Sequence, residues 1–161
     1  MSGSVLLWRI AAESKQYKAN DLSGGGAAKY PGRWNASGER VVYAAQSLAL
    51  AVLETAAHIN DAGLPLNRFV VEITVPARVW AEREVAHIQD IDPAWSAIPN
   101  GNASVAVGSA WYRNAARALL LVPSVVVQEE FAVLINATHP DAKHVKAKTV
   151  RAFEFNTLFR S

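Results

Sequence analysis

The apolar residues of this chain occur in short runs, and glycine, proline or polar residues end each run. In Phe69–Val75, apolar residues alternate with Glu72 and Thr74, which is the pattern of a strand with one buried face. Pro76 ends this strand, because proline has no amide hydrogen to donate to a neighbouring strand. No run reaches the roughly 18 apolar residues that a membrane span requires. The pattern favours a globular domain built from short strands.

Two segments are predicted to be helical, and the other apolar runs are predicted to be strands. Ser47 stands where an N-cap residue belongs, ahead of the alanine- and leucine-rich segment Leu48–Asn60. Ser109 is a second candidate cap, for a short helix over Ala110–Ala116. Further strands are expected at Leu6–Ile10, Val41–Ala45, Ala118–Val122, Val125–Val127, Phe131–Ile135 and Val145–Phe155, the last with a bulge.

The order of these elements predicts the fold class. Strands and helices do not alternate regularly, and residues 77–107 are expected to be irregular because they contain Pro93, Pro99 and a Pro-Asn-Gly turn. We therefore predict an α+β fold with a strongly curved, mostly antiparallel sheet and a few short helices. A chain of 161 residues, 51% of them hydrophobic, is expected to form one compact domain over residues 1–161.

Composition and charge exclude several classes of protein. The chain has no cysteine, so disulfides and thiolate chemistry are excluded and a cytoplasmic location is expected. Its four histidines lack the spacing of metal ligands, so no metal is expected. The net charge is +2, and the one basic cluster is Lys143, Lys146, Lys148 and Arg151. Its alternation indicates the solvent side of a strand, so no direct contact with nucleic acid is expected.

The residues with the clearest chemical potential lie in Gly24–Glu54. A glycine-rich loop ends in Gly32-Arg33-Trp34-Asn35, and Arg33 offers a planar charged group that suits phosphate oxygens. The loop has neither the Gly-Lys-Ser/Thr of a P-loop nor the strand and helix of a dinucleotide fingerprint. An ordinary surface arginine in a flexible loop is the alternative interpretation.

Tyr43 and Glu54 complete this group. An aromatic ring can stack on a flat cationic ring such as oxidised nicotinamide, and a tyrosine packed in the core is the alternative for Tyr43. Glu54 is the only acidic or basic residue, histidine aside, between Arg40 and Asp61. It is either a carboxylate at the rim of a pocket or part of the solvent edge of an amphipathic helix.

The order and spacing of these motifs resemble the RES domain. The motifs are Trp8-Arg9-Ile10, the glycine-rich loop, Gly32-Arg33-Trp34-Asn35, Val42-Tyr43-Ala44 and Leu48–Glu54, then Val122-Pro123-Ser124 and Asn136 ahead of His139-Pro140. The resemblance covers nearly the whole chain except Glu82–Val107. The loop departs from the family pattern, since Tyr30-Pro31-Gly32 stands where a pair of glycines is expected before the arginine.

The resemblance implies both a fold and an activity. The fold is similar to that of ADP-ribosyltransferases, with a split, curved sheet and an NAD cleft. The implied activity is that of a toxin of a type II toxin–antitoxin pair, which cleaves its substrate NAD+ at the nicotinamide–ribose bond. Growth arrest would follow from depletion of NAD+ or from transfer of ADP-ribose to a target protein. A non-catalytic nucleotide-binding module, which would hold NAD+ without turnover, remains the alternative.

The resemblance also implies partners. The antitoxin is expected to carry an Xre-like helix-turn-helix domain, and its C-terminal part is expected to cover the active site of the toxin. A toxin homodimer within the complex is compatible with this arrangement. Contact with DNA would then belong to the antitoxin, and no contact of this chain with a membrane is expected.

The residues that the resemblance assigns to the site are Arg9, Arg33, Asn35 and Tyr43 for NAD+ binding, and Arg33, Tyr43, Glu54 and Ser124 for catalysis. Arg33 would anchor phosphate or ribose, and Tyr43 would stack on nicotinamide. Glu54 would bind ribose hydroxyls and stabilise the developing cation. Ser124 would position a sugar hydroxyl or the carboxylate of Glu54.

Overall fold

A computed structural model describes residues 3–57 and 65–159 of the chain. The strands found there are β1 (Val5–Ala12), β2 (Val41–Ala45), β3 (Arg68–Val75), β4 (Glu84–Val85), β5 (Leu119–Pro123), β6 (Phe131–Asn136) and β7 (Lys146–Phe153). They form a sheet in the order β4-β5-β6-β2-β1-β3-β7. β4 and β5 are parallel, and every other neighbouring pair is antiparallel. The predicted α+β class and the mostly antiparallel sheet are confirmed.

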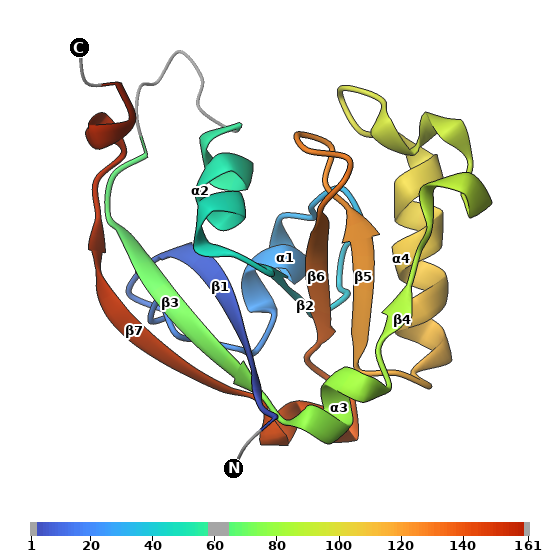
Figure 1. Ribbon diagram of the computed structural model, residues 1–161, viewed down its shortest axis with the longest axis horizontal. Coiled ribbons are helices and arrows are strands. Elements are labelled where there is room, and N and C mark those ends of the chain that lie inside the picture. Colours follow the sequence, from blue (N-terminus) through green and yellow to red (C-terminus); the bar gives the residue numbers. More distant parts are fainter. Residues whose placement is uncertain (1–2, 58–64, 160–161) are drawn as a thin grey trace.

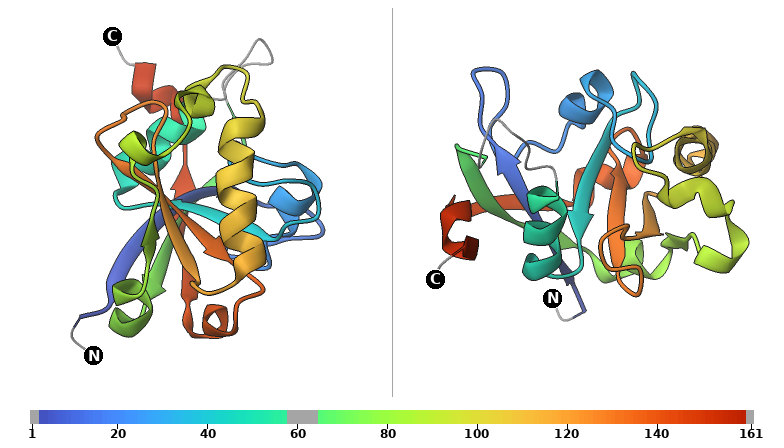
Figure 2. Two further views of the ribbon diagram at one scale, coloured as in Figure 1. Left: turned by 90° about the vertical axis from the view of Figure 1, so that its right-hand side faces the viewer. Right: turned by 90° about the horizontal axis from the view of Figure 1, so that it is seen from above.

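Four α-helices and four short 3-10 helices accompany the sheet in the described part of the chain. The α-helices are α1 (Gly25–Lys29), α2 (Leu48–Ala56), α3 (Ala77–Ala81) and α4 (Asn102–Asn114). The 3-10 helices are η1 (Ile88–Asp90), η2 (Pro93–Ser96), η3 (Pro140–His144) and η4 (Phe155–Phe159). Figure 2 shows α4 standing upright beside the β4–β5–β6 half of the sheet.

The sheet is nearly divided between β1 and β2. β1 pairs with β3 along its whole length, whereas its ladder with β2 consists of the single pair Trp8–Ala45. Figure 1 shows the two groups of strands diverging from the lower end of the molecule, with α2 above and between them. This geometry is the split, curved sheet that we expected.

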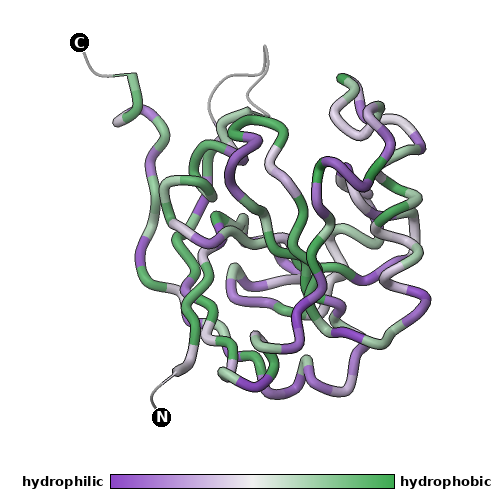
Figure 3. The backbone as a smooth tube through the Cα atoms, turned by 45° about the vertical axis from the view of Figure 1, so that its right-hand side comes forward, coloured by the Kyte–Doolittle hydropathy of each residue, from purple (hydrophilic) through white to green (hydrophobic). Residues whose placement is uncertain are grey.

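Three apolar clusters hold the layers together. The largest packs side chains of both halves of the sheet, among them the fully buried Leu7, Ile73, Leu119 and Val133. The second, which we call the tryptophan cluster, contains Trp34, Val41, Ala86, Trp95, Trp111, Leu120, Val122 and Leu134. The third, which we call the α2 cluster, contains Ile10, Ala45, Leu50, Ala51, Val52, Val70 and Phe155. Figure 3 shows that hydrophobic residues follow the strands and that many turns are polar.

The sequence correctly predicted the start of α2 and the bulge in the last strand. The Ser47 hydroxyl accepts a hydrogen bond from the Leu50 amide at 3.1 Å, so it caps α2 as predicted. The predicted end of this helix at Asn60 lies outside the described residues. The predicted bulge is present, because Val70 pairs with Arg151 and Val71 with Thr149, which leaves an extra residue on β7.

The expectation of an irregular segment over 77–107 was wrong. This segment contains α3, β4, η1, η2 and the first half of α4, which begins at Asn102 and not near Ser109. Ser109 lies inside the helix, where its hydroxyl donates to the Glu39 carboxylate at 2.8 Å. Gly108 faces the Trp34 carbonyl, where a Cβ would lie 1.6 Å from the oxygen. Tertiary packing against this loop therefore offsets the weak helix propensity of Asn102–Gly108.

The expected strand at Val125–Val127 is also absent, and these residues form part of the turn between β5 and β6. The amides of Val126 and Val127 both donate to the Ser124 hydroxyl oxygen at 3.1 Å. Because the side chain of Ser124 accepts these two bonds, the backbone turns instead of pairing with a neighbouring strand.

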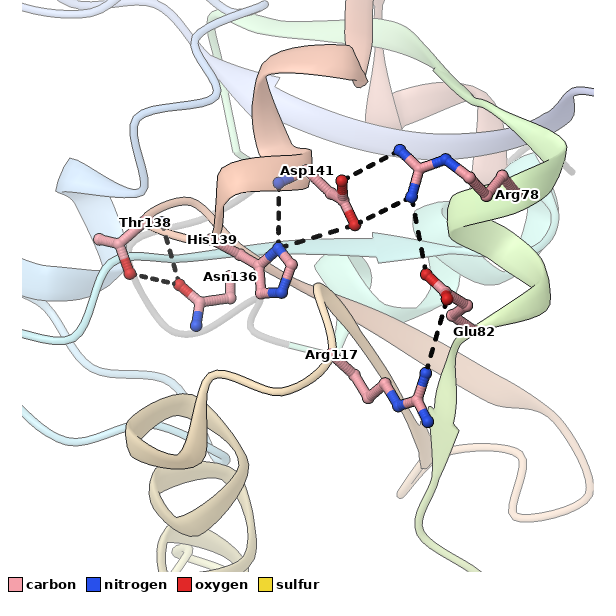
Figure 4. A network of polar contacts seen from close by, with 7 residues as sticks. All are labelled: Arg78, Glu82, Arg117, Asn136, Thr138, His139 and Asp141. Carbon is pink, nitrogen blue, oxygen red and sulfur yellow. Dashed lines mark hydrogen bonds and ion pairs between the residues drawn. The ribbon is translucent and has the colours of Figure 1, made fainter.

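A surface network of polar side chains joins α3 to η3 at the lower end of the molecule in Figure 1, and Figure 4 shows it from close by. Arg78 binds Asp141 at 3.0 Å and Glu82 at 3.7 Å, and Glu82 also approaches Arg117 at 3.9 Å. The hydrogen bond from Arg78 holds the pKa of Asp141 below its usual range. The side chains of Arg78, Glu82 and Arg117 are about half exposed, so the network contributes little to stability.

None of the helices found in residues 3–57 and 65–159 has the length and apolarity that a membrane crossing requires.

The cap of α2 is testable by removing the Ser47 hydroxyl. We expect Ser47→Ala to lower the free energy of unfolding by about 1 kcal/mol, because the Leu50 amide loses its partner. Urea denaturation followed by circular dichroism measures the loss. Ser37→Ala, which changes an exposed loop serine, is the matched control. An equal loss in both variants would contradict the capping role.

Candidate active site

The glycine-rich loop is held in place by a buried asparagine. Asn35 is 1% exposed, and its side-chain oxygen accepts from the Gly32 amide at 2.9 Å and from the Tyr43 hydroxyl at 2.8 Å. Its amide nitrogen donates to the carbonyls of Ala27 and Ala36. We expected Asn35 to bind NAD+, but its oxygen and both of its amide hydrogens are already bound within the protein. Asn35 therefore positions the loop.

A buried glutamate, which the sequence analysis missed, supports the same loop. Glu39 is 7% exposed, and its carboxylate accepts from the Ala36 amide at 2.7 Å and from the Ser109 hydroxyl at 2.8 Å. Arg113 approaches the other carboxylate oxygen at 3.7 Å. These contacts join the loop to α4, which lies 70 residues away along the chain.

Tyr43 connects the loop to the sheet. Its hydroxyl donates to Asn35 and accepts from the Trp34 amide at 3.0 Å, and burial raises the pKa of its phenol. Gly32 leaves room for this ring, because a Cβ at that position would lie 2.8 Å from Tyr43 Cζ and from the hydroxyl oxygen. The glycine directly before Arg33 is therefore needed for a close approach and not for an unusual backbone conformation.

Arg33 lies between the loop and η2. One guanidinium nitrogen, Nη1, donates to the carbonyls of Trp95 at 2.9 Å and Ala97 at 2.8 Å. The Arg33 carbonyl accepts from the Ser104 hydroxyl at 2.7 Å. Trp95 in turn stacks on Trp34, with ring centroids 5.8 Å apart. The segment that matched no family motif thus supplies the groups that hold Arg33.

Glu54 interacts electrostatically with Arg33. Partial burial lowers the pKa of the Arg33 guanidinium, and the charge of Glu54 acts in the opposite direction. Glu54 belongs to α2, which packs on the sheet through Leu50, Ala51 and Val52. Its Oε1 atom is buried and has no hydrogen-bond partner. A buried carboxylate oxygen without a hydrogen bond raises the free energy of the folded state. A ligand hydroxyl could donate the missing hydrogen bond.

Arg9 lies on the other side of Tyr43, at the narrow junction of β1 and β2. One guanidinium nitrogen donates to the Tyr43 carbonyl at 2.8 Å, and its buried Nε has no partner. Burial lowers the pKa of Arg9, and Asp21 acts in the opposite direction. Both Arg9 and Arg33 are therefore bound to the protein at one nitrogen.

Ser124 has a defined structural role. It is 1% exposed, and its hydroxyl oxygen accepts from the two amides of the β5–β6 turn. We expected Ser124 to position a sugar hydroxyl or Glu54. The other four candidates interact with one another by a hydrogen bond or through their charges: Arg9, Arg33, Tyr43 and Glu54. The Ser124 hydroxyl oxygen is instead bound by the amides of the turn.

Two other features of the molecule bear on the location of the site. A surface hollow of about 340 Å³ lies between the start of β3 and the end of β7, and none of the candidate residues lines it. Across the described residues, no group of three or more histidine, aspartate or glutamate side chains could hold a metal ion.

Comparisons with known proteins show which proteins the chain is similar to. The model of the RES domain matches residues 6–157. The chain is 52% identical to the Prs ADP-ribosylating toxin of Sphingobium sp. over 92% of each protein. It is 30% identical to a Toxin Res of Photorhabdus laumondii, over 94% of this chain and 93% of the relative. It is 33% identical to a Toxin Res of Pseudomonas putida, over 88% of this chain and 91% of the relative.

A solved structure has the same fold. It is the crystal structure of the M. tuberculosis MbcT-MbcA toxin–antitoxin complex, with a TM-score of 0.66 and 17% sequence identity. The match covers 92% of this chain and 85% of the other. At this identity the likeness concerns the fold alone.

The close approach of Gly32 to Tyr43 generates a stability prediction. We expect Gly32→Ala to lower the free energy of unfolding by about 1–3 kcal/mol, because the new methyl group would displace a ring that two hydrogen bonds hold. Gly26→Ala is the control, since nothing lies within 4 Å of its Cβ position. Urea denaturation compares the two variants, and an unchanged Gly32→Ala midpoint would refute the proposed close packing.

Proposed function

This chain belongs to the RES domain family, as its motifs predicted, and we propose that it cleaves NAD+ and transfers ADP-ribose to a protein. The observation that carries the proposal is the buried, unpartnered Oε1 of Glu54 within the electrostatic reach of Arg33. A carboxylate and a guanidinium near each other suit a substrate that combines ribose hydroxyls with a diphosphate.

The reaction breaks the bond between ribose C1′ and the nicotinamide nitrogen. The electron pair of this bond moves to the nicotinamide nitrogen, so nicotinamide leaves as a neutral molecule and needs no general acid. The acceptor nucleophile forms a bond to C1′ and loses a proton. Positive charge develops on the ribose, as in glycoside cleavage, and the protein has to stabilise it.

The Glu54 carboxylate supplies that stabilisation. It accepts hydrogen bonds from the ribose hydroxyls and places negative charge near the developing oxocarbenium ion. This role requires an oxygen that no protein group already occupies, and Oε1 meets the requirement. The gain is largest in the transition state, because the positive charge is largest there.

The two arginines bind the phosphate and ribose portion of NAD+. Arg33 uses Nη1 to bind Trp95 and Ala97, so its other nitrogens can donate to phosphate. The buried Nε of Arg9 is a second donor, at the junction of β1 and β2. Tyr43, fixed by its hydroxyl, stacks on nicotinamide through its ring. Ser124 acts through the β5–β6 turn that it caps.

The acceptor is a protein, and the Sphingobium relative supports this choice. That relative is named for ADP-ribosylation of Prs, and the 52% identity extends over 92% of both proteins. We propose that Prs is the target of this chain as well. Modification of Prs would then account for the growth arrest expected of a toxin.

The partner is an antitoxin, and the fold supports this choice, since the matching solved structure is a toxin–antitoxin complex. We propose that the antitoxin has an Xre-like helix-turn-helix domain and that its C-terminal part covers the site. A toxin homodimer forms within the complex, and the complex is located in the cytoplasm.

The role of Glu54 is testable by nicotinamide release from NAD+. We expect Glu54→Gln to lower the rate about 10²–10³-fold, because the amide removes the negative charge without changing the shape. Glu84→Gln, at an exposed position on β4, is the matched control and should retain the wild-type rate. Full activity of Glu54→Gln would remove this residue from the mechanism.

The acceptor is testable with biotinylated NAD+ in a cell lysate. We expect a labelled protein band that Glu54→Gln does not produce. Free ADP-ribose as the main product would indicate hydrolysis instead, and its phosphorylated form would indicate a phosphate acceptor. A thermal shift with NAD+ but no turnover would identify a nucleotide-binding module.

A further inference from the structure

Exposed apolar side chains lie on α2 beside Glu54, on the segment after η2 that binds Arg33, and on the β5–β6 turn, which packs against both. Leu53 is 44% exposed, Val126 is 43% exposed and Ile98 is 83% exposed. We call these three residues the apolar rim. Large apolar side chains that gather around a site at the surface are typical of a surface that binds another protein.

Two residues of the apolar rim adjoin site residues along the backbone. Leu53 directly precedes Glu54 on α2. Ile98 directly follows Ala97, whose carbonyl accepts from Arg33. Figures 1 and 2 show α2, the β5–β6 turn and the segment after η2 at the same upper end of the molecule.

Val126 lies between the other two segments of the rim. Its neighbour Val125 packs against the tryptophan cluster, which contains Trp95 of η2. Its other neighbour, Val127, packs against the α2 cluster. The β5–β6 turn therefore spans from η2 to α2, and the side chain of Val126 is exposed between them.

The exposed charged side chains in the segments that carry the apolar rim are acidic. Residues 41–57, 84–112 and 118–142 contain no lysine or arginine, although the chain carries 16 such residues. Exposed carboxylates of the same segments are Glu84, Asp90, Asp92, Glu129 and Glu130. The basic residues of β7 lie at one edge of the sheet, and those of η3 follow the end of β6 that is opposite the β5–β6 turn. The rim is therefore apolar and acidic, with the arginines of the site inside it.

This charge decides which partner fits. A second copy of the same rim would be repelled by its own carboxylates, and an anionic lipid surface would be repelled in the same way. A protein surface in which an apolar side chain lies beside lysine or arginine would be attracted. The acceptor of a transferred ADP-ribose has to approach Glu54, and it therefore meets this rim.

We propose that the apolar rim binds the protein acceptor through an apolar side chain flanked by lysine or arginine on the acceptor surface. This inference rests on the proposed function, because it assumes that the acceptor is a protein. The rim acts in recognition and not in bond cleavage. Hydrolysis of NAD+, in which water replaces the protein acceptor at C1′ and loses a proton as nicotinamide leaves, does not require it.

The test separates recognition of the acceptor from cleavage of NAD+. Val126→Lys and Ile98→Lys place a cation on the rim, where it repels the acceptor. Val150→Lys, at a 47% exposed position on β7, is the matched control. Two rates are measured at saturating NAD+ for each variant: labelling of purified Prs with biotinylated NAD+, and nicotinamide release in the absence of Prs.

We expect each rim variant to label Prs about tenfold more slowly, whereas nicotinamide release stays within about twofold of the wild type. Val150→Lys should match the wild type in both assays. Equal labelling by the rim variants and the control would overturn the proposal. A parallel loss of labelling and nicotinamide release would overturn it too, because it would place the rim in NAD+ cleavage.

Binding of Prs to the immobilised chain provides a second measurement that does not depend on chemistry. Binding should weaken with salt, and Glu129→Gln combined with Glu130→Gln should reduce that dependence. Failure of the wild type to release nicotinamide would refute the proposed function, and the binding data would still test the rim. The proposal would be refuted if Prs did not bind to the wild-type chain. It would also be refuted if the rim variants bound Prs normally and lost binding only to the antitoxin.

Discussion

The buried side chain of Asn35 is the contact on which the site depends. Its oxygen joins the Gly32 amide to the Tyr43 hydroxyl, so the loop and β2 are bound together as one unit. Arg33 lies within this unit, and its position follows from the bonds on either side of it. A buried amide with all of its hydrogen bonds satisfied stabilises one conformation, because any other leaves polar groups unpaired.

The near-division of the sheet explains why a site can exist at its centre. β1 and β2 share the single ladder pair Trp8–Ala45, and the two halves of the sheet diverge above it. α2 packs above the junction through its α2 cluster residues, so the helix brings Glu54 toward the loop. Arg9 binds the Tyr43 carbonyl across the junction. The gap in the ladder therefore positions the proposed NAD+ site.

The segment between β4 and α4 completes this arrangement and also shapes the surface. The carbonyls of Trp95 and Ala97 hold Arg33 in place, while the exposed Ile98 follows directly. The same segment therefore positions a residue of the site and contributes to the apolar rim. If the proposed roles are correct, a change of this segment among related chains would alter acceptor recognition without altering the carboxylate proposed to act on NAD+.

The sequence by itself determined the α+β class, most strands, the cap of α2 and the bulge in β7. Its motifs also named six candidate site residues: Arg9, Arg33, Asn35, Tyr43, Glu54 and Ser124. These features depend on residues close together in the chain, where periodicity, capping and motif order are informative. Only the tertiary structure decided that Asn35 positions the loop, that Ser124 caps a turn and that α4 begins at Asn102. The contacts of Arg33 with Trp95 and of Glu39 with Ser109 join residues 62 and 70 positions apart. Such contacts form only when the packed core brings distant segments together, so no local pattern reveals them.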